Sequence, residues 1–493
     1  MAVGHRHHRA TKRPAALVGV AALLLLAAGC VSGKPTQQAQ VNPPLPPLSP
    51  RLSGVERPAN REHSRLIAAF GGEYQSPAVE GLMSDVLARV VRASADPSQS
   101  YKITILNSPT VNAFALADSN LYVTRGLLAL ANDTSEIAAV LAHEIGHVTA
   151  NHAQARAELE QRSILVSRVV AEVLNDPTAG QMVRNESRVS LAGFSRAQEL
   201  EADRIGIRTI SKAGFDPKGA SRFLASLGRN SDLRVDRTSS GRSDADFLSS
   251  HPTTPERLAQ AAGVARSLDG SVGHDADRDR YLTAIDGMTF GEDPNEGYVR
   301  GRRFIHPGLA IAFAAPEGFA LENTYQAVLG IAAGGSQALR FDGVELPPDQ
   351  TLEGFFASGW IEGLENGSIQ TTTVNGLPAA TATAKGKEWT FRLGAVRSEG
   401  TVYRLLYATR SSGPESERVF RETLGSIRRL SSDEVRSVKP WRITVVTARD
   451  GDTAEKVAAR MASDQALERF LVLNGLERGA TLRPGQRYKI VAE

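Results

Sequence analysis

The pattern that most restricts how this chain can fold is the pentapeptide His143-Glu144-Ile145-Gly146-His147. Two histidines four residues apart lie about 40° apart around an α-helix, so both imidazoles reach one metal ion only if this stretch is helical. The glutamate between them then lies where a water molecule on that ion would be. The pattern therefore predicts a helix with a zinc site, in which His143 and His147 are ligands and Glu144 is the catalytic base.

The residues before the pentapeptide predict where this helix begins. Asp133-Thr134-Ser135-Glu136 resembles a capping box, which places both histidines in the third turn of a continuous helix. The side chains around that helix are small or apolar on nearly every face, which predicts that it is buried. A pair of hydrogen-bonded core histidines is the alternative to a metal site.

A zinc hydrolase needs a third protein ligand and one position left open for water. Ser195 and Gln198 predict the start of a second helix, on which Glu199 and Asp203 share a face with small and apolar residues. A carboxylate on a buried face is costly unless it binds a cation or accepts hydrogen bonds. We therefore expect Glu199 to be the third ligand and Asp203, one turn later, to orient a histidine ligand.

Other polar residues compete for the role of third ligand. His152 lies about 180° from His143 if the helix is continuous, so we expect it to be a packing or orienting histidine. Glu186 lies in a polar stretch where nothing orients it, and Glu201 shares a solvated helix face with Arg204. None of these residues displaces Glu199.

The histidine pentapeptide followed by Glu199-x-x-x-Asp203 resembles the gluzincin metallopeptidase family that includes HtpX and the CAAX prenyl endopeptidases, specifically its soluble periplasmic lipoprotein branch. The resemblance covers residues 61 to about 265. It implies a mainly α, zincin-like (α+β) peptidase domain at residues 61–267, with one Zn²⁺ per chain.

Two strand-like pieces, residues 102–106 and 114–124, lie between the helical segments of that domain. Asn112, Ala113 and Phe114 resemble the family's strand beside the active-site cleft, which implies that an extended substrate pairs with this strand through its main chain. An ordinary core strand is the alternative.

Two further segments concern access to the site. Residues 250–257 resemble a family segment near the cleft, and in some periplasmic relatives the histidine at the place of His251 covers the zinc and holds the enzyme latent. This makes His251 a candidate fourth ligand or cleft residue. The amphipathic stretch 164–174 is expected to be a lid or a packed helix.

The first 60 residues predict export and a tether. A basic stretch to Arg13 leads into an apolar run that is shorter than a membrane-spanning helix, and this run ends in a sequence that resembles a bacterial lipobox. We therefore expect a lipoprotein signal peptide at 1–29, a lipid anchor on Cys30 and a proline-rich linker at 30–60. These features predict a periplasmic protein anchored to a bacterial membrane, and we expect the outer membrane.

Composition divides the rest of the chain into two further parts, so we expect a multidomain protein. Short alternating segments at residues 298–432 predict a sheet-rich α+β domain that faintly resembles PsbP-like domains. Residues 440–493 contain Gly451-Asp452-Thr453 and Leu482-Arg483-Pro484-Gly485-Gln486, which resemble a LysM module, a small β-α-α-β unit that binds peptidoglycan.

The charge balance excludes a general nucleic-acid-binding surface. Four basic residues lie in the predicted signal peptide, and the remainder has 53 basic and 54 acidic residues. Two functions stay open. One is a zinc endopeptidase of the cell envelope that acts on unfolded or misassembled envelope proteins. The other is a peptidoglycan-associated scaffold or chaperone with a capped zinc site, although a scaffold has no chemical need for the base Glu144.

Overall fold

The computed structural model describes residues 58–116, 119–173, 194–235, 247, 251–252, 254–268, 274–324, 326–463 and 465–493. The predicted signal peptide, Cys30 and nearly all of the predicted linker lie outside these residues. Among the residues described, none of the helices is both long enough and apolar enough to cross a membrane.

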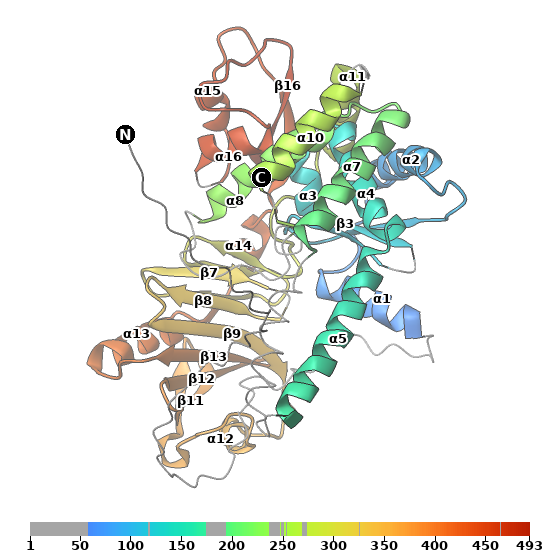
Figure 1. Cartoon of the computed structure of the whole chain (residues 1–493). Helices are drawn as coiled ribbons and strands as arrows, with labels where there is room; N and C mark the ends of the chain where they lie inside the picture. Colours follow the sequence, from blue (N-terminus) through green and yellow to red (C-terminus); the bar gives the residue numbers. More distant parts are fainter. Residues whose placement is uncertain are drawn as a thin grey trace, which may run out of the picture. The chain divides into compact units, whose positions relative to one another are not determined.

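The first part of the fold is helical and surrounds a small sheet (Figure 1). Its helices are α1 (Pro58–Ala69), α2 (Pro77–Ala93), α3 (Arg125–Leu130), α4 (Thr134–Thr149), α5 (His152–Val173), α7 (Arg196–Lys212), α8 (Gly219–Val235), α10 (Pro255–Ser267) and α11 (His274–Ile285). Helices α2, α7 and α8 pack on α4, whose residues from Thr134 to His147 are all buried. The predicted buried helix is thus confirmed.

The small sheet has three strands, β1 (Lys102–Leu106), β2 (Ala113–Ala115) and β3 (Asn120–Thr124). Their order is β1-β3-β2, with β1 parallel and β2 antiparallel to β3. The stretch 114–124, predicted as one strand-like piece, therefore belongs to two antiparallel strands. Ser119, just before β3, has a φ of 67°, and β2 lies at the edge of the sheet.

The second part is a sheet domain that begins at Tyr298. A four-stranded sheet with the order β14-β6-β5-β4 contains β4 (Tyr298–Arg300), β5 (Arg303–His306), β6 (Ile311–Ala314) and β14 (Arg428–Arg429). A seven-stranded antiparallel sheet has the order β10-β11-β12-β13-β9-β8-β7. Its strands are β7 (Phe319–Asn323), β8 (Val328–Ala332), β9 (Gln337–Glu345), β10 (Gln370–Val374), β11 (Leu377–Lys385), β12 (Thr390–Ser398) and β13 (Thr401–Thr409).

Helices cover both faces of the larger sheet. Helix α13 (Pro414–Gly425) packs through Phe420 on one face, and α12 (Leu352–Ala357) packs through Phe356 on the other. A short 3₁₀ helix, η1 (Asn366–Ser368), and α14 (Ser432–Ser437) complete this part. The sheet-rich α+β texture predicted for 298–432 is observed.

The C-terminal module, defined here as residues 440–493, has the predicted β-α-α-β order. It consists of β15 (Arg442–Thr447), α15 (Ala454–Ala458), α16 (Ala466–Leu473) and β16 (Arg487–Ala492), and the two strands pair antiparallel. Its identity as a LysM module stays a prediction.

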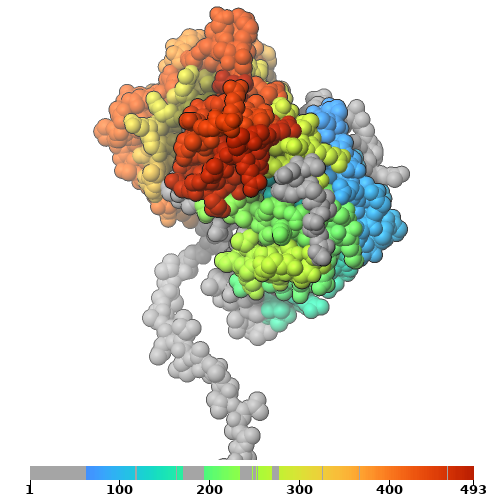
Figure 2. All heavy atoms as spheres, turned by 90° about the horizontal axis from the view of Figure 1, so that it is seen from above, coloured from blue at the N-terminus to red at the C-terminus, as the bar shows by residue number. Residues whose placement is uncertain are grey.

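The C-terminal module shares its core with the helical part. Ile443, Val472, Leu473 and Val491 belong to the same apolar cluster as the side chains of α2 and α4. Figure 2 shows the C-terminal residues, in red, lying against the yellow-green residues of the helical part. The two segments form one folded body although the sheet domain separates them in sequence.

Backbone hydrogen bonds join the segments on either side of the sheet domain. Gly287 N donates to Ile443 O at 2.8 Å, and Phe290 N donates to Trp441 O at 2.7 Å. The chain therefore leaves and re-enters the helical part at almost the same point, and the sheet domain is inserted between these two segments.

Candidate metal centre

Helix α4 places the histidine pentapeptide as its sequence predicts. Asp133 is the N-cap, and its side chain accepts a hydrogen bond from Glu136 N at 2.9 Å. The helix runs without interruption to Thr149, so His143 and His147 lie one turn apart. Both rings are buried, with exposed fractions of 5% and 3%.

Helix α7 brings Glu199 to these histidines. A capping box formed by Ser195 and Gln198 starts the helix, as predicted. Glycine allows α7 to approach α4 closely, because a Cβ atom on Gly206 would lie 3.1 Å from His143 N and one on Gly146 would lie 3.2 Å from Ala202 O. A larger residue at either position would force the two helices apart.

The nitrogen and oxygen donors converge between α4 and α7. His143 Nε2 and His147 Nε2 are 3.0 Å apart, and Glu199 Oε1 lies 3.3 Å from His147 Nε2. His251 adds a fourth donor, because its Nδ1 lies 2.9 Å from Glu199 Oε1 and 3.3 Å from His143 Nε2. One donor atom from each of the four residues lies within 4.8 Å of the others.

Asp203 contacts the far side of the His143 ring, and Arg257 fixes both carboxylates of α7. Asp203 Oδ1 lies 2.9 Å from His143 Nδ1. Arg257 donates to both Asp203 oxygens at 2.8 Å, and its terminal nitrogen lies 2.6 Å from Glu199 Oε2. Burial alone would raise the pKa of Asp203, but the hydrogen bonds from Arg257 and His143 lower that pKa to about 2.

The role of Arg257 is absent from the sequence predictions. The segment 250–257 was singled out only for His251, although Arg257 ends the same segment. An arginine in the first turn of a predicted helix usually indicates a solvated face, whereas this guanidinium is only 2% exposed.

His147 also has a partner on its second ring nitrogen. His152 Nδ1 lies 2.9 Å from His147 Nδ1, and His152 Nε2 lies 3.4 Å from Glu201 Oε2. Burial lowers the pKa of His147 to about 3, so its ring is neutral and can donate a lone pair to a metal.

The position predicted for His152, opposite His143, requires one continuous helix. The helix is not continuous, so this prediction of direction is wrong. Helix α4 ends at Thr149, Asn151 has a φ of 54°, and α5 begins at His152 in a new direction. The break turns the His152 ring back toward His147. Glu201, predicted to be a solvated partner of Arg204, is half exposed and contacts His152.

Glu144 lies beside the four donor residues but is not one of them. Its carboxylate is buried, and Oε1 has no hydrogen-bond partner among the residues described, with His251 Nε2 at 3.7 Å. Burial raises the pKa of Glu144, and the neighbouring His251 and His143 only partly oppose that rise. A buried carboxylate oxygen that accepts no hydrogen bond is available to accept a proton.

The predicted substrate strand lies next to α4. Ala113 and Phe114 belong to the edge strand β2, which packs along α4, and Asn112 precedes it. Thr124 N donates to Asn112 O at 3.0 Å, and the Phe114 ring stacks on Tyr122 with centroids 5.0 Å apart. One side of β2 therefore pairs with β3, and the other is an edge.

The donor set suits zinc. Imidazole nitrogens with one carboxylate oxygen, converging in a buried site, are the ligands that zinc takes in hydrolytic enzymes. The contacts of His143 with Asp203 and of His147 with His152 are the outer contacts that orient such ligands. The predicted alternative, a hydrogen-bonded histidine pair in the core, does not account for four converging donors.

Comparison with known proteins supports this assignment. Residues 77–265 match the family described as Peptidase family M48. The Beta-barrel assembly-enhancing protease of Escherichia coli (strain K12) is 29% identical over 189 residues, which are 36% of this chain and 37% of that protein. The Mitochondrial metalloendopeptidase OMA1 of Arabidopsis thaliana is 33% identical over 173 residues, which are 34% of this chain and 33% of that protein.

The aligned part is about a third of each of these two relatives. Among solved structures, that of cyanobacterial PsbP from Synechocystis sp. PCC 6803 aligns with 27% of this chain and 98% of that chain, at 15% identity and a TM-score of 0.22. That score is too low to support the predicted PsbP-like fold, which stays a prediction. Residues 77–265 are therefore similar to peptidase family M48, and the four clustered donor residues lie inside the matched range.

Proposed function

We propose that this protein is a zinc-dependent endopeptidase of the bacterial cell envelope. The observation that carries the proposal is the convergence of His143, His147 and Glu199 beside the buried carboxylate of Glu144, whose Oε1 accepts no hydrogen bond from the residues described. A metal site that only stabilises a fold needs the ligands but not this carboxylate. The family match and the peptidase names of the relatives support the same activity.

In this mechanism, His143, His147 and Glu199 would hold the zinc ion, and Asp203, by engaging His143 Nδ1, would keep Nε2 of that ring directed at the metal. Zinc, when bound, polarises a peptide carbonyl and makes water more acidic. Glu144 takes a proton from the attacking water and then passes it to the amine that leaves. The edge strand β2, which contains Ala113 and Phe114, is proposed to pair with the extended substrate together with Asn112, which precedes it.

The decisive experiment is the substitution Glu144→Gln. Glutamine keeps the shape of the side chain but cannot accept the proton, so cleavage of an unfolded protein such as casein should fall by about 10²- to 10⁴-fold. Zinc content, measured by mass spectrometry, should be unchanged because Glu144 is not a ligand. The exposed Glu160→Gln variant is the matched control and should cleave as the unsubstituted protein does. Cleavage by Glu144→Gln at the unsubstituted rate would refute the mechanism.

The cellular role is proposed from the names of the relatives and from the predicted leader. The bacterial relatives are named as proteases that enhance β-barrel assembly, which supports unfolded or misassembled envelope proteins as substrates. A lipid anchor on Cys30, a periplasmic location at the outer membrane and peptidoglycan binding by residues 440–493 belong to the same proposal.

One observation favours the second candidate, a scaffold or chaperone with a capped zinc site. His251 is a fourth donor within the cluster, and a protein ligand in that position would exclude water. Replacing His251 with Ala tests this cap. If His251 closes the site, the His251→Ala variant should cleave casein several-fold faster at equal zinc content. An inactive protein whose His251→Ala variant is equally inactive would favour the scaffold.

A further inference from the structure

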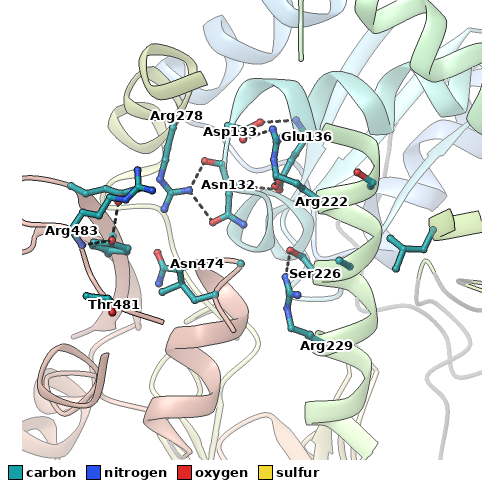
Figure 3. Close-up of a pocket in the computed structure, with 17 residues that line it drawn as sticks. Asn132, Asp133, Glu136, Arg222, Ser226, Arg229, Arg278, Asn474, Thr481 and Arg483 are labelled. Carbon is teal, nitrogen blue, oxygen red and sulfur yellow. Dashed lines mark hydrogen bonds and ion pairs between the residues drawn. The ribbon is translucent and has the colours of Figure 1, made fainter. Parts of the chain in front are cut away.

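A second concave site lies away from the histidine cluster. A cavity of about 640 Å³ is enclosed by the start of α4, by α8 and α11, and by the C-terminal module (Figure 3). Its volume is in the range that holds small ligands. None of the four clustered donors lines it. Asp133, the N-cap, and Glu136, in the first turn, reach it from the start of α4, and the same helix carries His143 about two turns later.

The lining of this cavity carries more positive than negative charge. Arg222, Arg229, Arg278 and Arg483 line it, against the two acids Asp133 and Glu136. Arg222 lies 2.9 Å from Asp133 and 3.5 Å from Glu136, so much of the negative charge is already engaged. Burial, ahead of the charge of Asp133, raises the pKa of Glu136 to about 7, which reduces that charge further.

Arg278 is the residue that points to the chemistry of a ligand. It is 8% exposed, and one terminal nitrogen lies 3.3 Å from both Asn132 O and Asn132 Oδ1. Its Nε has no hydrogen-bond partner, and no carboxylate oxygen of the described chain lies within 4.0 Å of the guanidinium. A buried guanidinium bonded only to neutral groups is stabilised by an anion, above all by a planar carboxylate that can engage two of its donors.

The rest of the lining favours a peptide end over a sugar. Arg483 is exposed and its guanidinium has no ion-pair partner in the described chain, while Gln486, Ser221 and Thr481 supply neutral hydrogen-bonding groups. The aromatic ring at the cavity is that of Tyr488, which is only 2% exposed, so the lining offers no open ring face for a sugar to stack on.

We propose that this cavity binds the free C-terminal carboxylate of a peptide chain, with Arg278 and Arg483 as its anion-binding residues. The site is separate from the zinc site and does not depend on catalysis. It gives the protein a second point of contact with peptides, one that recognises a chain end rather than an extended segment.

The test is calorimetric titration of the full chain carrying Glu144→Gln, which prevents cleavage, with acetyl-Ala-Ala-Ala and with the same peptide ended by an amide. The free acid should bind at least about tenfold more tightly than the amide, because the amide cannot form the charge-assisted pair. Adding Arg483→Met should remove most of that preference. This side chain is exposed, so the protein should still fold.

The matched control is Arg460→Met, which removes an exposed arginine of the same module that does not line the cavity. This variant should keep the preference for the acid. Equal binding of acid and amide, or a preference that survives Arg483→Met, would overturn the proposal. Binding of N-acetylmuramic acid without binding of the peptide acid would overturn it in favour of a sugar acid.

Discussion

At the scale of single residues, the candidate metal centre depends on Arg257. This buried guanidinium connects Glu199, a proposed ligand, to Asp203, which orients another proposed ligand. Burial by itself would lower the pKa of Arg257, but the hydrogen bonds and charges of Asp203 and Glu199 outweigh it and raise that pKa. Arg257 is therefore charged at any pH at which the protein folds.

Replacing Arg257 with Met should destabilise the protein. Two carboxylates would remain buried without their cation, and breaking a buried ion pair of this kind costs about 3–5 kcal/mol. The free energy of unfolding, measured in urea on zinc-free protein, should fall by about that amount.

The control for this prediction is Arg266→Met, which removes an exposed arginine from the same helix, α10. It should change the free energy of unfolding by no more than about 0.5 kcal/mol. Similar losses for the two variants would show that Arg257 has no special structural role.

The sequence predicts the centre in part, and the reason is physical. His143, His147, Glu199 and Asp203 could be placed because each pair lies within two turns of one helix, where spacing determines direction. Arg257 and His152 could not be placed in the same way. Arg257 on α10 bonds to Asp203 on α7, and these two residues are 54 positions apart in sequence. The direction of the His152 side chain depends on the end of α4 and the positive φ of Asn151.

At the scale of elements, α4 joins two chemically different places. Its first turn contributes Glu136 to the cavity, and its third and fourth turns carry the histidines. Glu136 is buried, accepts a hydrogen bond from Asn132 N at 2.9 Å and faces Arg222. Its raised pKa makes the stability of this helix end dependent on pH.

The direction of that dependence follows from the raised pKa of Glu136. The folded protein holds the Glu136 proton up to about pH 7, whereas the ordinary value of 4.5 applies to the unfolded chain. The stabilising contribution is therefore complete below pH 4.5 and is lost as the pH rises to about 7, by up to about 3 kcal/mol.

A Glu136→Gln variant should not show this loss. As the pH rises from 4.5 to 7, the free energy of unfolding of the unsubstituted protein should therefore fall relative to that of the Glu136→Gln variant. Chemical unfolding at a series of pH values measures that difference. A difference that stays constant with pH would contradict the prediction.

Helix starts were the most predictable elements, and strand ends the least. Asp133 and Ser195 cap their helices through local side-chain bonds, which a sequence pattern shows directly. Ser119 has a φ of 67° between β2 and β3. The apolar pattern alone placed both strands in one piece, although Asp118, Ser119 and Asn120 are residue types that favour turns.

At the scale of the whole molecule, the C-terminal module belongs to the same folded body as the helical part. Lys489 is fully buried, and its Nζ donates to the carbonyl groups of Ala129, Leu130 and Ala131 at the end of α3. Composition changes could predict where segments begin and end. They could not predict that two segments separated by about 150 residues would share one core, because that depends on contacts between distant parts of the chain.

Deleting residues 440–493 should therefore prevent folding of the helical part. The deletion removes four buried apolar side chains from the shared core, at roughly 1.5–3 kcal/mol each, which together approach the stability of a typical domain. Circular dichroism and zinc binding of the truncated protein would measure the loss.

Excising residues 291–440 is the matched control. Phe290 N and Trp441 O are 2.7 Å apart, so a short glycine-serine linker can close the gap. This variant should fold and bind zinc. A truncated protein that folds as well as the excised one would show that the C-terminal module is an independent domain.

Because Lys489 and Val491 are buried against the helical part, the helical part cannot complete its core until translation reaches the C-terminal module. A ribosome makes the histidine-bearing helix more than 300 residues before the strand that completes the core around it. The helical part of the nascent chain therefore stays incomplete, and its candidate metal centre unassembled, until synthesis has passed the inserted sheet domain.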